Sequence, residues 1–347
     1  MLAAVYHGLN DLRVEDIVKP TIGEDEALLR VKAAAICGTD LRILASGHFK
    51  IPQGMRRILG HELAGEVVEV GARASGLVPG MRIAIAPNTG CGTCEQCVQS
   101  RDHLCLNYEA FGISLDGAFA EYMRIPASFI RRGNIVPVPE GISYEEGALN
   151  ESFSCCYHGS RACRIEPGDV VLIVGAGPIG IMHLLLARLS GASTVIVSEM
   201  IEERRLQALE FGADLTVDPG KQDLLAAVRE ASHGRGADVI IVAAPAPSAQ
   251  EQSLDLAATR GRINFFGGLP KGSEFIRFKS NWVHYREITV TGTTGSSNYE
   301  FHRSMEIIAS GRVALAPLIS ARFPLSEAQE AFAVAASKKA LKVIINP

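Results

Sequence analysis

The clearest pattern in the chain lies between residues 170 and 290, where short apolar runs alternate with stretches of helical periodicity. The apolar runs predict strands at Val170–Val174, Val195–Val197, around Leu215, Val239–Val242, Ile263–Phe266 and Ile288–Val290. Between them the pattern predicts helices at Ile179–Leu189, Glu203–Phe211, Leu224–Ala231 and Gln250–Ala258. Regular alternation of strands and helices predicts an α/β fold with a doubly wound parallel sheet.

The first part of the chain has a different pattern. Residues 1–148 contain short β-rich segments separated by Gly and Pro, with little helical periodicity. Examples are Ala27–Val31, Gly65–Val70 and Arg82–Ala86. We therefore expect a compact, mainly β domain over 1–148, followed by the α/β domain over 149–291.

The last segment, 292–347, is too short to fold alone. It predicts helices at Glu300–Ala309 and at Ser326–Ala335, the second opened by Ser326, and a final strand at Lys342–Ile345. We expect it to pack back on the first domain. The total length of 347 residues also fits two domains.

Composition and charge narrow the choice of partners. The formal net charge is −4, charged residues make up 21% of the chain, and no basic block is present, so we expect no nucleic-acid partner. The apolar stretch Ile179–Leu189 contains His183 and Arg188 and falls short of the roughly 20 residues that span a membrane. No secretion-signal pattern opens the chain. A cytoplasmic protein that acts on a small molecule, without a membrane partner, is the expectation.

A glycine-rich loop follows the first strand of the α/β domain and opens a helix. In Gly175-Ala176-Gly177-Pro178-Ile179-Gly180, Gly175 suits a tight turn and Gly177 lets the backbone approach a pyrophosphate. Gly180 permits close packing of the helix, whose N-terminus attracts phosphate. We therefore predict a dinucleotide site that includes Pro178 and Ile179.

An acidic residue follows at the end of the next strand. Glu199 comes 24 residues after Gly175 and is placed to accept hydrogen bonds from the adenine ribose. A carboxylate there repels a 2′-phosphate, which favours NAD over NADP. Arg204 and Arg205 leave NADP open, since an arginine can pair with that phosphate. NAD is the cofactor that we expect, with Arg204 among its contacts.

Four of the eight cysteines lie within one short lobe, at about 88–108. They are Cys91, Cys94, Cys97 and Cys105. In a large cytoplasmic chain, close cysteines indicate metal binding rather than disulfides. Four thiolates suit tetrahedral zinc in a closed structural site. An iron–sulfur cluster does not match, because the last gap is seven residues and Leu106 follows Cys105.

A second, dispersed set of residues offers a different zinc site. It consists of Cys37, His61, Glu62 and Glu151. A thiolate, an imidazole and a carboxylate can hold zinc and leave one coordination position open. Spacing alone does not distinguish this set from residues that merely pack in a core.

Taken together, these motifs resemble the medium-chain zinc-dependent dehydrogenases, and most of all the sorbitol and threonine dehydrogenase branch. The resemblance covers nearly the whole chain. It rests on Cys-Gly-Thr-Asp at 37–40, Gly-His-Glu at 60–62, the four-cysteine lobe, Gly-Ala-Phe-Ala-Glu-Tyr at 117–122, Glu151 and the glycine loop. It implies a GroES-like, mainly β catalytic domain followed by a Rossmann NAD-binding domain.

The resemblance also implies roles for individual residues. Cys37, His61 and Glu62 would be catalytic zinc ligands, and Glu151 either a fourth ligand or a partner of the bound water. Thr39 would contact the substrate alcohol, and Asp40 would orient His61. Phe266, Gly267 and Thr293 fall where the family brings its backbone to the nicotinamide.

The chain departs from the family at two places. A histidine commonly stands three residues after the Ser or Thr at the Thr39 position and continues the proton relay, but this chain has Arg42. His48 and water are the alternatives for that step. The loop Val242–Pro247 is also richer in proline than the family pattern, which leaves its cofactor contacts open.

The predicted function is oxidation of a secondary alcohol, such as a polyol, sugar alcohol or cyclitol, to a ketone with zinc and NAD. One alternative is an L-threonine 3-dehydrogenase or a dehydrogenase of a phosphorylated or acidic polyol, for which positive charge is available near the predicted zinc ligands at Arg42, Lys50, Arg56 and Arg57. Another is a non-catalytic protein that binds NAD and zinc. The resemblance further implies a homotetramer or homodimer, assembled through strands of the nucleotide domain.

Overall fold

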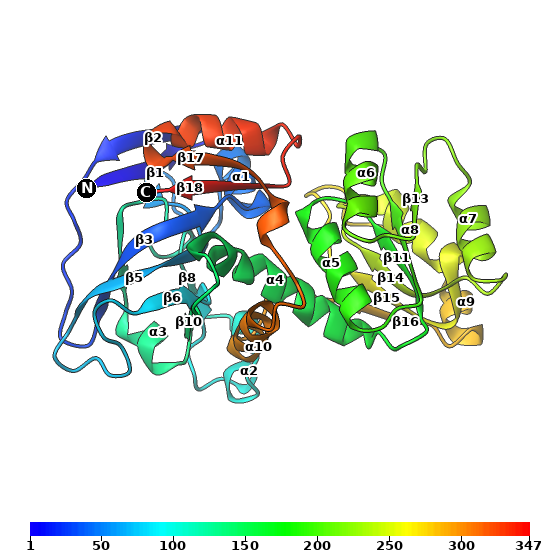
Figure 1. The fold of residues 1–347 in the computed structure, drawn as a ribbon, viewed down its shortest axis with the longest axis horizontal. Helices are drawn as coiled ribbons and strands as arrows, with labels where there is room; N and C mark the ends of the chain where they lie inside the picture. Colours follow the sequence, from blue (N-terminus) through cyan, green and yellow to red (C-terminus); the bar gives the residue numbers. More distant parts are fainter. The chain divides into compact units, whose positions relative to one another are not determined.

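The computed structural model describes residues 1–347, which divide into two compact units (Figure 1). The first unit contains Met1–Ser154 and Ser296–Pro347, and the second contains Cys155–Gly295. The C-terminal segment is therefore part of the first unit, where its last strand pairs antiparallel with an N-terminal strand through Ile344 and Ala35. No helix combines the length and apolar character that crossing a membrane requires.

The first unit is built on a seven-stranded sheet. The strands run in the order β10-β6-β5-β3-β18-β17, and β9 pairs with β3. Their bounds are β3 (Ala27–Ala35), β5 (Glu62–Val70), β6 (Arg82–Ile85), β9 (Tyr122–Ile125), β10 (Ile135–Pro137), β17 (Ile319–Pro324) and β18 (Lys342–Asn346). Large buried side chains, among them Phe111, Phe119 and Phe129, fill its core. The expected mainly β domain is confirmed.

Smaller elements complete the first unit. Two further sheets contain β1 (Leu2–Gly8), β2 (Asp11–Asp16) and β4 (Arg57–Ile58), and β7 (Asn88–Thr89) and β8 (Glu109–Ala110). The α-helices are α1 (Gly38–Ser46), α2 (Glu95–Val98), α3 (Ala127–Arg131), α10 (Asn298–Ala309) and α11 (Ala328–Ala336). A long helix, α4 (Tyr144–Cys163), contributes residues to both units.

Two elements of the first unit were missed from the sequence, and the start of one helix was predicted wrongly. Helix α1 was not predicted, because only Asp40 and Ile43 among its nine residues are buried and the apolar period is therefore weak. Strand β17 was also missed. Ser326 does not open α11; it lies in a short 3₁₀ turn, and Glu327 precedes the first residue of the helix.

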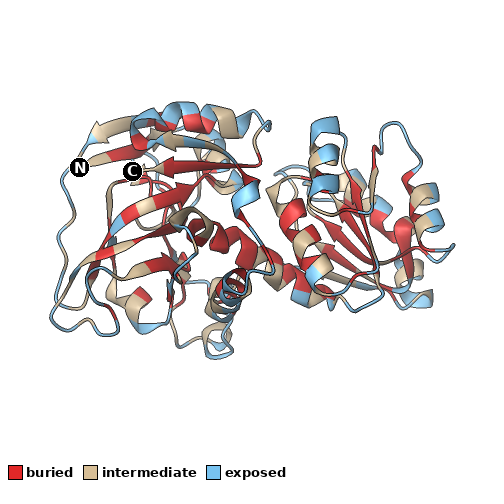
Figure 2. Ribbon diagram, in the orientation of Figure 1, coloured by how far each residue is buried: buried red, intermediate tan, exposed pale blue.

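The second unit contains a six-stranded parallel sheet in the order β13-β12-β11-β14-β15-β16. The strands are β11 (Val170–Val174), β12 (Thr194–Ser198), β13 (Leu215–Val217), β14 (Ala237–Val242), β15 (Ala257–Phe265) and β16 (Thr289–Gly292). The helices are α5 (Pro178–Leu189), α6 (Glu202–Glu210), α7 (Leu224–Ala231), α8 (Pro247–Leu256) and α9 (Ser280–Tyr285). Figure 2 shows its central strands as buried. The predicted doubly wound sheet is confirmed, although α8 ends two residues earlier than predicted and β15 begins there.

The strand order fixes where a ligand can bind to this sheet. From β11 the chain proceeds outward to β12 and β13, and then returns to β14 on the other side of β11. Ligands of doubly wound sheets bind beyond the carboxyl ends of the strands at such a reversal. The glycine loop at 175–180 directly follows β11 and therefore lies at that point.

Candidate metal and cofactor sites

Strand pairing in the first unit brings three of the four predicted catalytic-site ligands together. Strands β3 and β5 are antiparallel neighbours, and their register places Ala35 opposite Glu62. Cys37 comes two residues after the end of β3 and His61 directly precedes β5, so both lie at the same end of this strand pair. The candidate ligand atoms of Cys37, His61 and Glu62 all lie within 4.8 Å of one another.

A buried carboxylate fixes the two segments that carry these side chains. Asp40 is fully buried; its Oδ2 accepts a hydrogen bond from the Cys37 backbone N–H at 2.9 Å, and its Oδ1 accepts one from Gly60 N–H at 3.2 Å. The predicted contact with His61 is looser, because Nδ1 lies 3.4 Å from Asp40 Oδ1 without hydrogen-bond geometry. The principal contribution of Asp40 is thus to the backbone on either side of the cluster.

The surroundings of His61 favour positive charge. Burial lowers the pKa of its imidazole, but Asp40 and Cys37 outweigh burial and hold the pKa well above its usual range. The buried Nδ1 has no hydrogen-bond partner. An imidazole, a thiol and a carboxylate with ligand atoms this close together are a donor set that zinc accepts, so these residues fit the predicted metal.

A lysine from the far end of the chain enters the same cluster. Nζ of Lys342, the first residue of β18, lies 2.5 Å from both carboxylate oxygens of Glu62. The side chains are 3% and 0% exposed. Burial alone would lower the pKa of Lys342, yet Glu62, Cys37 and Glu151 raise it above its usual value. The lysine is therefore held as a cation.

Sequence reasoning missed Lys342. It lies 280 residues from Glu62, and no motif connects the two positions. The one available signal was a lysine that opens an apolar strand whose next residues, Val343 to Ile345, are buried. A buried lysine requires a counter-ion.

Glu151 lies outside the three-residue group. It is buried in α4, and its charge acts on Lys342, but its carboxylate does not lie within 4.8 Å of all the other ligand atoms. Its predicted role as a ligand or as a partner of bound water stays a prediction.

Thr39 and the nearby basic residues have different surroundings. Thr39 lies in the first turn of α1, and its hydroxyl accepts a hydrogen bond from Arg42 Nη2 at 3.3 Å. Arg57 is paired with Asp116 at 2.9 Å. The Lys50 ammonium donates to the Tyr108 carbonyl at 2.6 Å and lies over the Tyr108 ring. Arg42 is thus the basic residue in contact with the predicted alcohol-binding hydroxyl.

The four-cysteine lobe forms a second, compact cluster. The sulfur atoms of Cys91, Cys94, Cys97 and Cys105 lie within 4.8 Å of one another. Hydrogen bonds from Thr93, first its backbone N–H and then its hydroxyl, together with one from the Cys94 N–H, lower the pKa of Cys91 to about 5, whereas burial raises the pKa of Cys97 to about 12. A thiolate is the form that binds zinc. The lobe fits the predicted structural zinc site, with no position left for a substrate.

In the second unit, the glycine loop has the close packing that its glycines imply. Gly175 has φ +103°, which favours glycine. A Cβ on Gly180 would lie 1.9 Å from the Gly175 carbonyl oxygen, so a side chain there would displace the helix. Pro178 is the first residue of α5 and Ile179 the second. The helix N-terminus therefore faces the loop, as phosphate binding requires.

Glu199 lies directly beside this loop. Its carboxylate accepts hydrogen bonds from the backbone N–H groups of Ala176 at 2.9 Å and Ile201 at 3.0 Å. Arg205 is occupied, because it donates to the Glu199 carbonyl and pairs with Asp218 at 3.3 Å. The Arg204 guanidinium comes within 3.9 Å of where a Gly177 Cβ would lie. Arg204, and not Arg205, thus faces the glycine loop.

The other predicted cofactor residues end at the same edge of the sheet. Phe266 and Gly267 follow β15, and Thr293 follows β16. The Thr293 hydroxyl donates to the buried Asn264 side chain at 3.1 Å, and the Phe266 ring packs edge-on against His183. Their backbone positions are well defined, and their contact with nicotinamide stays a prediction.

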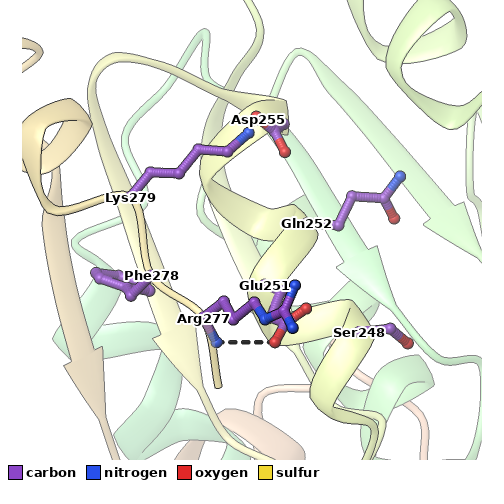
Figure 3. A pocket seen from close by; sticks show the side chains of 7 residues that line it. All are labelled: Ser248, Glu251, Gln252, Asp255, Arg277, Phe278 and Lys279. Atoms are coloured by element: carbon purple, nitrogen blue, oxygen red, sulfur yellow. Dashed lines mark hydrogen bonds and ion pairs between the residues drawn. The ribbon is translucent and has the colours of Figure 1, made fainter.

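A hollow of about 600 Å³ on the second unit lies between α8 and residues 277–279 (Figure 3). Three of the charged side chains that line it already have partners. Glu251 accepts a hydrogen bond from the Arg277 backbone N–H at 2.8 Å, and Lys279 pairs with Asp255 at 2.5 Å. It therefore offers no unpaired ligand set comparable to the two clusters of the first unit.

Comparison with known proteins agrees with this arrangement. Residues 23–140 match the alcohol dehydrogenase GroES-like domain, and residues 178–310 match the zinc-binding dehydrogenase domain. An L-threonine 3-dehydrogenase of Pyrococcus horikoshii is 35% identical over 95% of this chain and 92% of its own. A sorbitol dehydrogenase of Bacillus subtilis is 31% identical over 100% and 97%. Among solved structures, a zinc-binding dehydrogenase of Sinorhizobium meliloti bound to NADP superposes with a TM-score of 0.92 at 34% identity, covering 100% of this chain and 99% of that one.

Proposed function

Because the chain belongs to the zinc-dependent alcohol dehydrogenase family, we propose that it oxidises a secondary alcohol of the polyol type to a ketone with NAD. The observation that carries this proposal is that the ligand atoms of Cys37, His61 and Glu62 all lie within 4.8 Å of one another in the first unit. Zinc bound there would lower the pKa of an alcohol at its open position and so allow hydride transfer to the nicotinamide.

The residues around the cluster have separate tasks in this proposal. Asp40 holds the backbone of both ligand segments in place. The Thr39 hydroxyl accepts a hydrogen bond from Arg42 and keeps its own proton to exchange with the substrate hydroxyl. Arg42 cannot take that proton onward, because a guanidinium does not lose its charge in proteins.

His48 is our candidate for the next step of the proton path, with water as the alternative. Its Nδ1 accepts a hydrogen bond from the Lys50 backbone N–H, so Nε2 carries the proton of the neutral ring and can donate it while Nδ1 takes up another in place of the Lys50 contact. Burial, followed by the charges of Arg42 and Lys50, lowers the pKa of His48. A neutral imidazole at neutral pH is able to accept a proton.

Glu199 supports NAD as the preferred dinucleotide. Its carboxylate is fixed beside the glycine loop by two backbone hydrogen bonds, so it is already ordered to accept from a ribose hydroxyl. It would repel a 2′-phosphate there. The Sinorhizobium relative is bound to NADP. The activity of this protein with NAD and with NADP must therefore be compared directly.

A second candidate substrate class is an alcohol that carries a carboxylate or a phosphate, either L-threonine or a phosphorylated or acidic polyol. It is favoured by the contact between Arg42 and Thr39, because a guanidinium can bind a carboxylate or phosphate next to the reacting hydroxyl. Several relatives at 32–36% identity are L-threonine 3-dehydrogenases.

For assembly and location we propose a homotetramer or homodimer, by resemblance to the family, in the cytoplasm. The location rests on eight free cysteines, five of which lie in the two candidate metal clusters and suit metal binding under reducing conditions.

The test is a substrate panel with zinc-loaded protein and either NAD or NADP. Compounds without and with an acidic group would include galactitol with galactitol 1-phosphate and 2,3-butanediol with L-threonine, besides the neutral sorbitol, xylitol and inositols. We expect turnover of a neutral polyol with NAD; an Arg42→Ala variant that loses only the anionic substrates would favour the second class. No turnover by a protein that still binds NAD tightly would favour the non-catalytic alternative.

A further inference from the structure

The pair formed by Lys342 and Glu62 is unusual in its position. Both carboxylate oxygens lie 2.5 Å from the ammonium, and neither side chain reaches solvent. Glu62 is also one of the three residues gathered at the candidate zinc site. The same carboxylate therefore has two cationic partners available, the lysine and the metal.

The lysine also faces more than one anion. The charges of Cys37 and Glu151 act on it in addition to that of Glu62. Without a cation, the buried carboxylates of Glu62 and Glu151 would lie near each other and near the partly buried Cys37 thiol, which is costly for any of them in ionised form. Asp40 adds a fourth acidic group, but its oxygens are directed to the Cys37 and Gly60 backbone.

From this arrangement we propose that Lys342 is a built-in counter-ion, which stabilises the metal-free fold and competes with zinc for Glu62. The inference rests on the proposed zinc site. Lys342 is a positioning residue: it lies at the start of β18, which pairs with β17 and β3, so the strand holds the ammonium against the cluster.

Two opposite effects follow from removing the lysine. The metal-free protein loses the partner of a buried carboxylate, so a Lys342→Met variant should unfold at a temperature lower by roughly 10 °C. Zinc loading should restore most of that loss, because the metal supplies the missing positive charge. At the same time one repulsive charge disappears, so zinc should bind the folded variant about tenfold or more tightly.

The experiment measures thermal unfolding with and without zinc, and the zinc dissociation constant at this site by competition with a chelator. In both states compared, the four-cysteine lobe keeps its zinc. The Cys37 site alone is either empty or saturated with zinc. The matched control is Lys339→Met, an exposed lysine in the turn before β18. It should change neither quantity.

Two further variants keep the proposal testable if Lys342→Met does not fold without zinc. Lys342→Met combined with Glu62→Gln removes both charges and should recover much of the metal-free stability. Lys342→Arg keeps the charge and should stay near the parent protein in zinc affinity. Equal metal-free stability of Lys342→Met and the parent, or weaker zinc binding by the folded variant, would overturn the proposal. If zinc fails to bind the parent at Cys37 and His61, the proposed function fails instead.

Discussion

Asp40 Oδ2 accepts a hydrogen bond from the Cys37 backbone N–H at 2.9 Å. This contact caps the N-terminus of α1 and fixes the backbone of Cys37, which carries the candidate zinc thiolate. Its other oxygen holds the backbone next to His61, through Gly60 N–H. One buried carboxylate therefore sets the separation of two ligands that are far apart in the sequence.

Replacing Asp40 with asparagine tests this relationship. The amide offers one accepting oxygen where the carboxylate offers two, so one of the two backbone contacts is lost. We expect a loss of about 1–2 kcal/mol in the free energy of unfolding. Zinc affinity at the Cys37 site should fall about 10- to 100-fold, as for other groups that orient metal ligands. Asp16→Asn, at an exposed position, is the control; equal zinc affinity in both variants would contradict the role given to Asp40.

The four-cysteine lobe should bind its zinc independently of the catalytic cluster. In Cys94→Ala one thiolate is missing from a closed tetrahedral site, so the zinc content should fall from two ions to one per chain. The lobe should become sensitive to protease near residues 88–108, because a metal that orders a loop contributes to its folding. Cys163→Ala, at a buried cysteine outside both clusters, should keep both ions. Metal analysis that finds two ions in Cys94→Ala would show that the lobe is not a zinc site.

Glu199→Gln should shift the choice between the two dinucleotides. The substitution removes the negative charge that repels a 2′-phosphate and one of the two oxygens that can accept hydrogen bonds from the ribose. The remaining amide oxygen can still accept a hydrogen bond from one backbone N–H. The kcat/KM for NAD should fall about 10- to 100-fold and that for NADP should rise. Glu202→Gln, on the exposed first turn of α6, is the control. An unchanged NAD to NADP ratio would remove Glu199 from the cofactor site.

His183 should make the protein sensitive to acid. Burial lowers its pKa to about 3, whereas a histidine in the unfolded chain titrates near 6.5. Above about pH 6.5 the imidazole is neutral in both states and stability is unaffected. Between about pH 6.5 and 3 the unfolded chain binds a proton that the folded chain does not, so stability falls as pH falls, by about 1.4 kcal/mol per pH unit.

Urea unfolding of His183→Gln at several pH values measures this contribution. Relative to the parent, the variant should lose about 2.3 kcal/mol less between pH 6.5 and 4.5, because the unfolded histidine is already half protonated at pH 6.5. His284→Gln, at an exposed position, should follow the parent. Parallel pH profiles for His183→Gln and the parent would mean that His183 is not buried as a neutral ring.

The sequence allowed much of the second unit to be predicted, because its signals are local. The turn at Gly175, the helix that begins at Pro178 and the acid at the end of β12 are all close in the chain. Turn geometry and the alternation of strands and helices involve residues that are close in the sequence, so the amino-acid pattern is enough to predict them. The four cysteines were predictable for the same reason.

The catalytic cluster depends on contacts that no local pattern contains. The pairing of Ala35 with Glu62 joins Cys37 to His61, and β18 brings Lys342 from the other end of the chain. Helix α1 was missed because it buries only two of its nine residues and therefore shows no clear apolar period. Its N-terminus is stabilised by Asp40 instead. Family resemblance supplied Cys37, His61 and Glu62, but it gave no indication of Lys342.

The most direct test of the central claim is zinc titration of protein freed of metal, followed by NADH formation from the active polyol of the panel. In the parent, activity should appear as zinc fills the Cys37 site. In Cys37→Ala, the four-cysteine lobe should still take up one ion, and NADH should not form. Zinc-independent activity of the parent, or full activity of Cys37→Ala, would contradict the assignment of Cys37, His61 and Glu62 as the catalytic metal site.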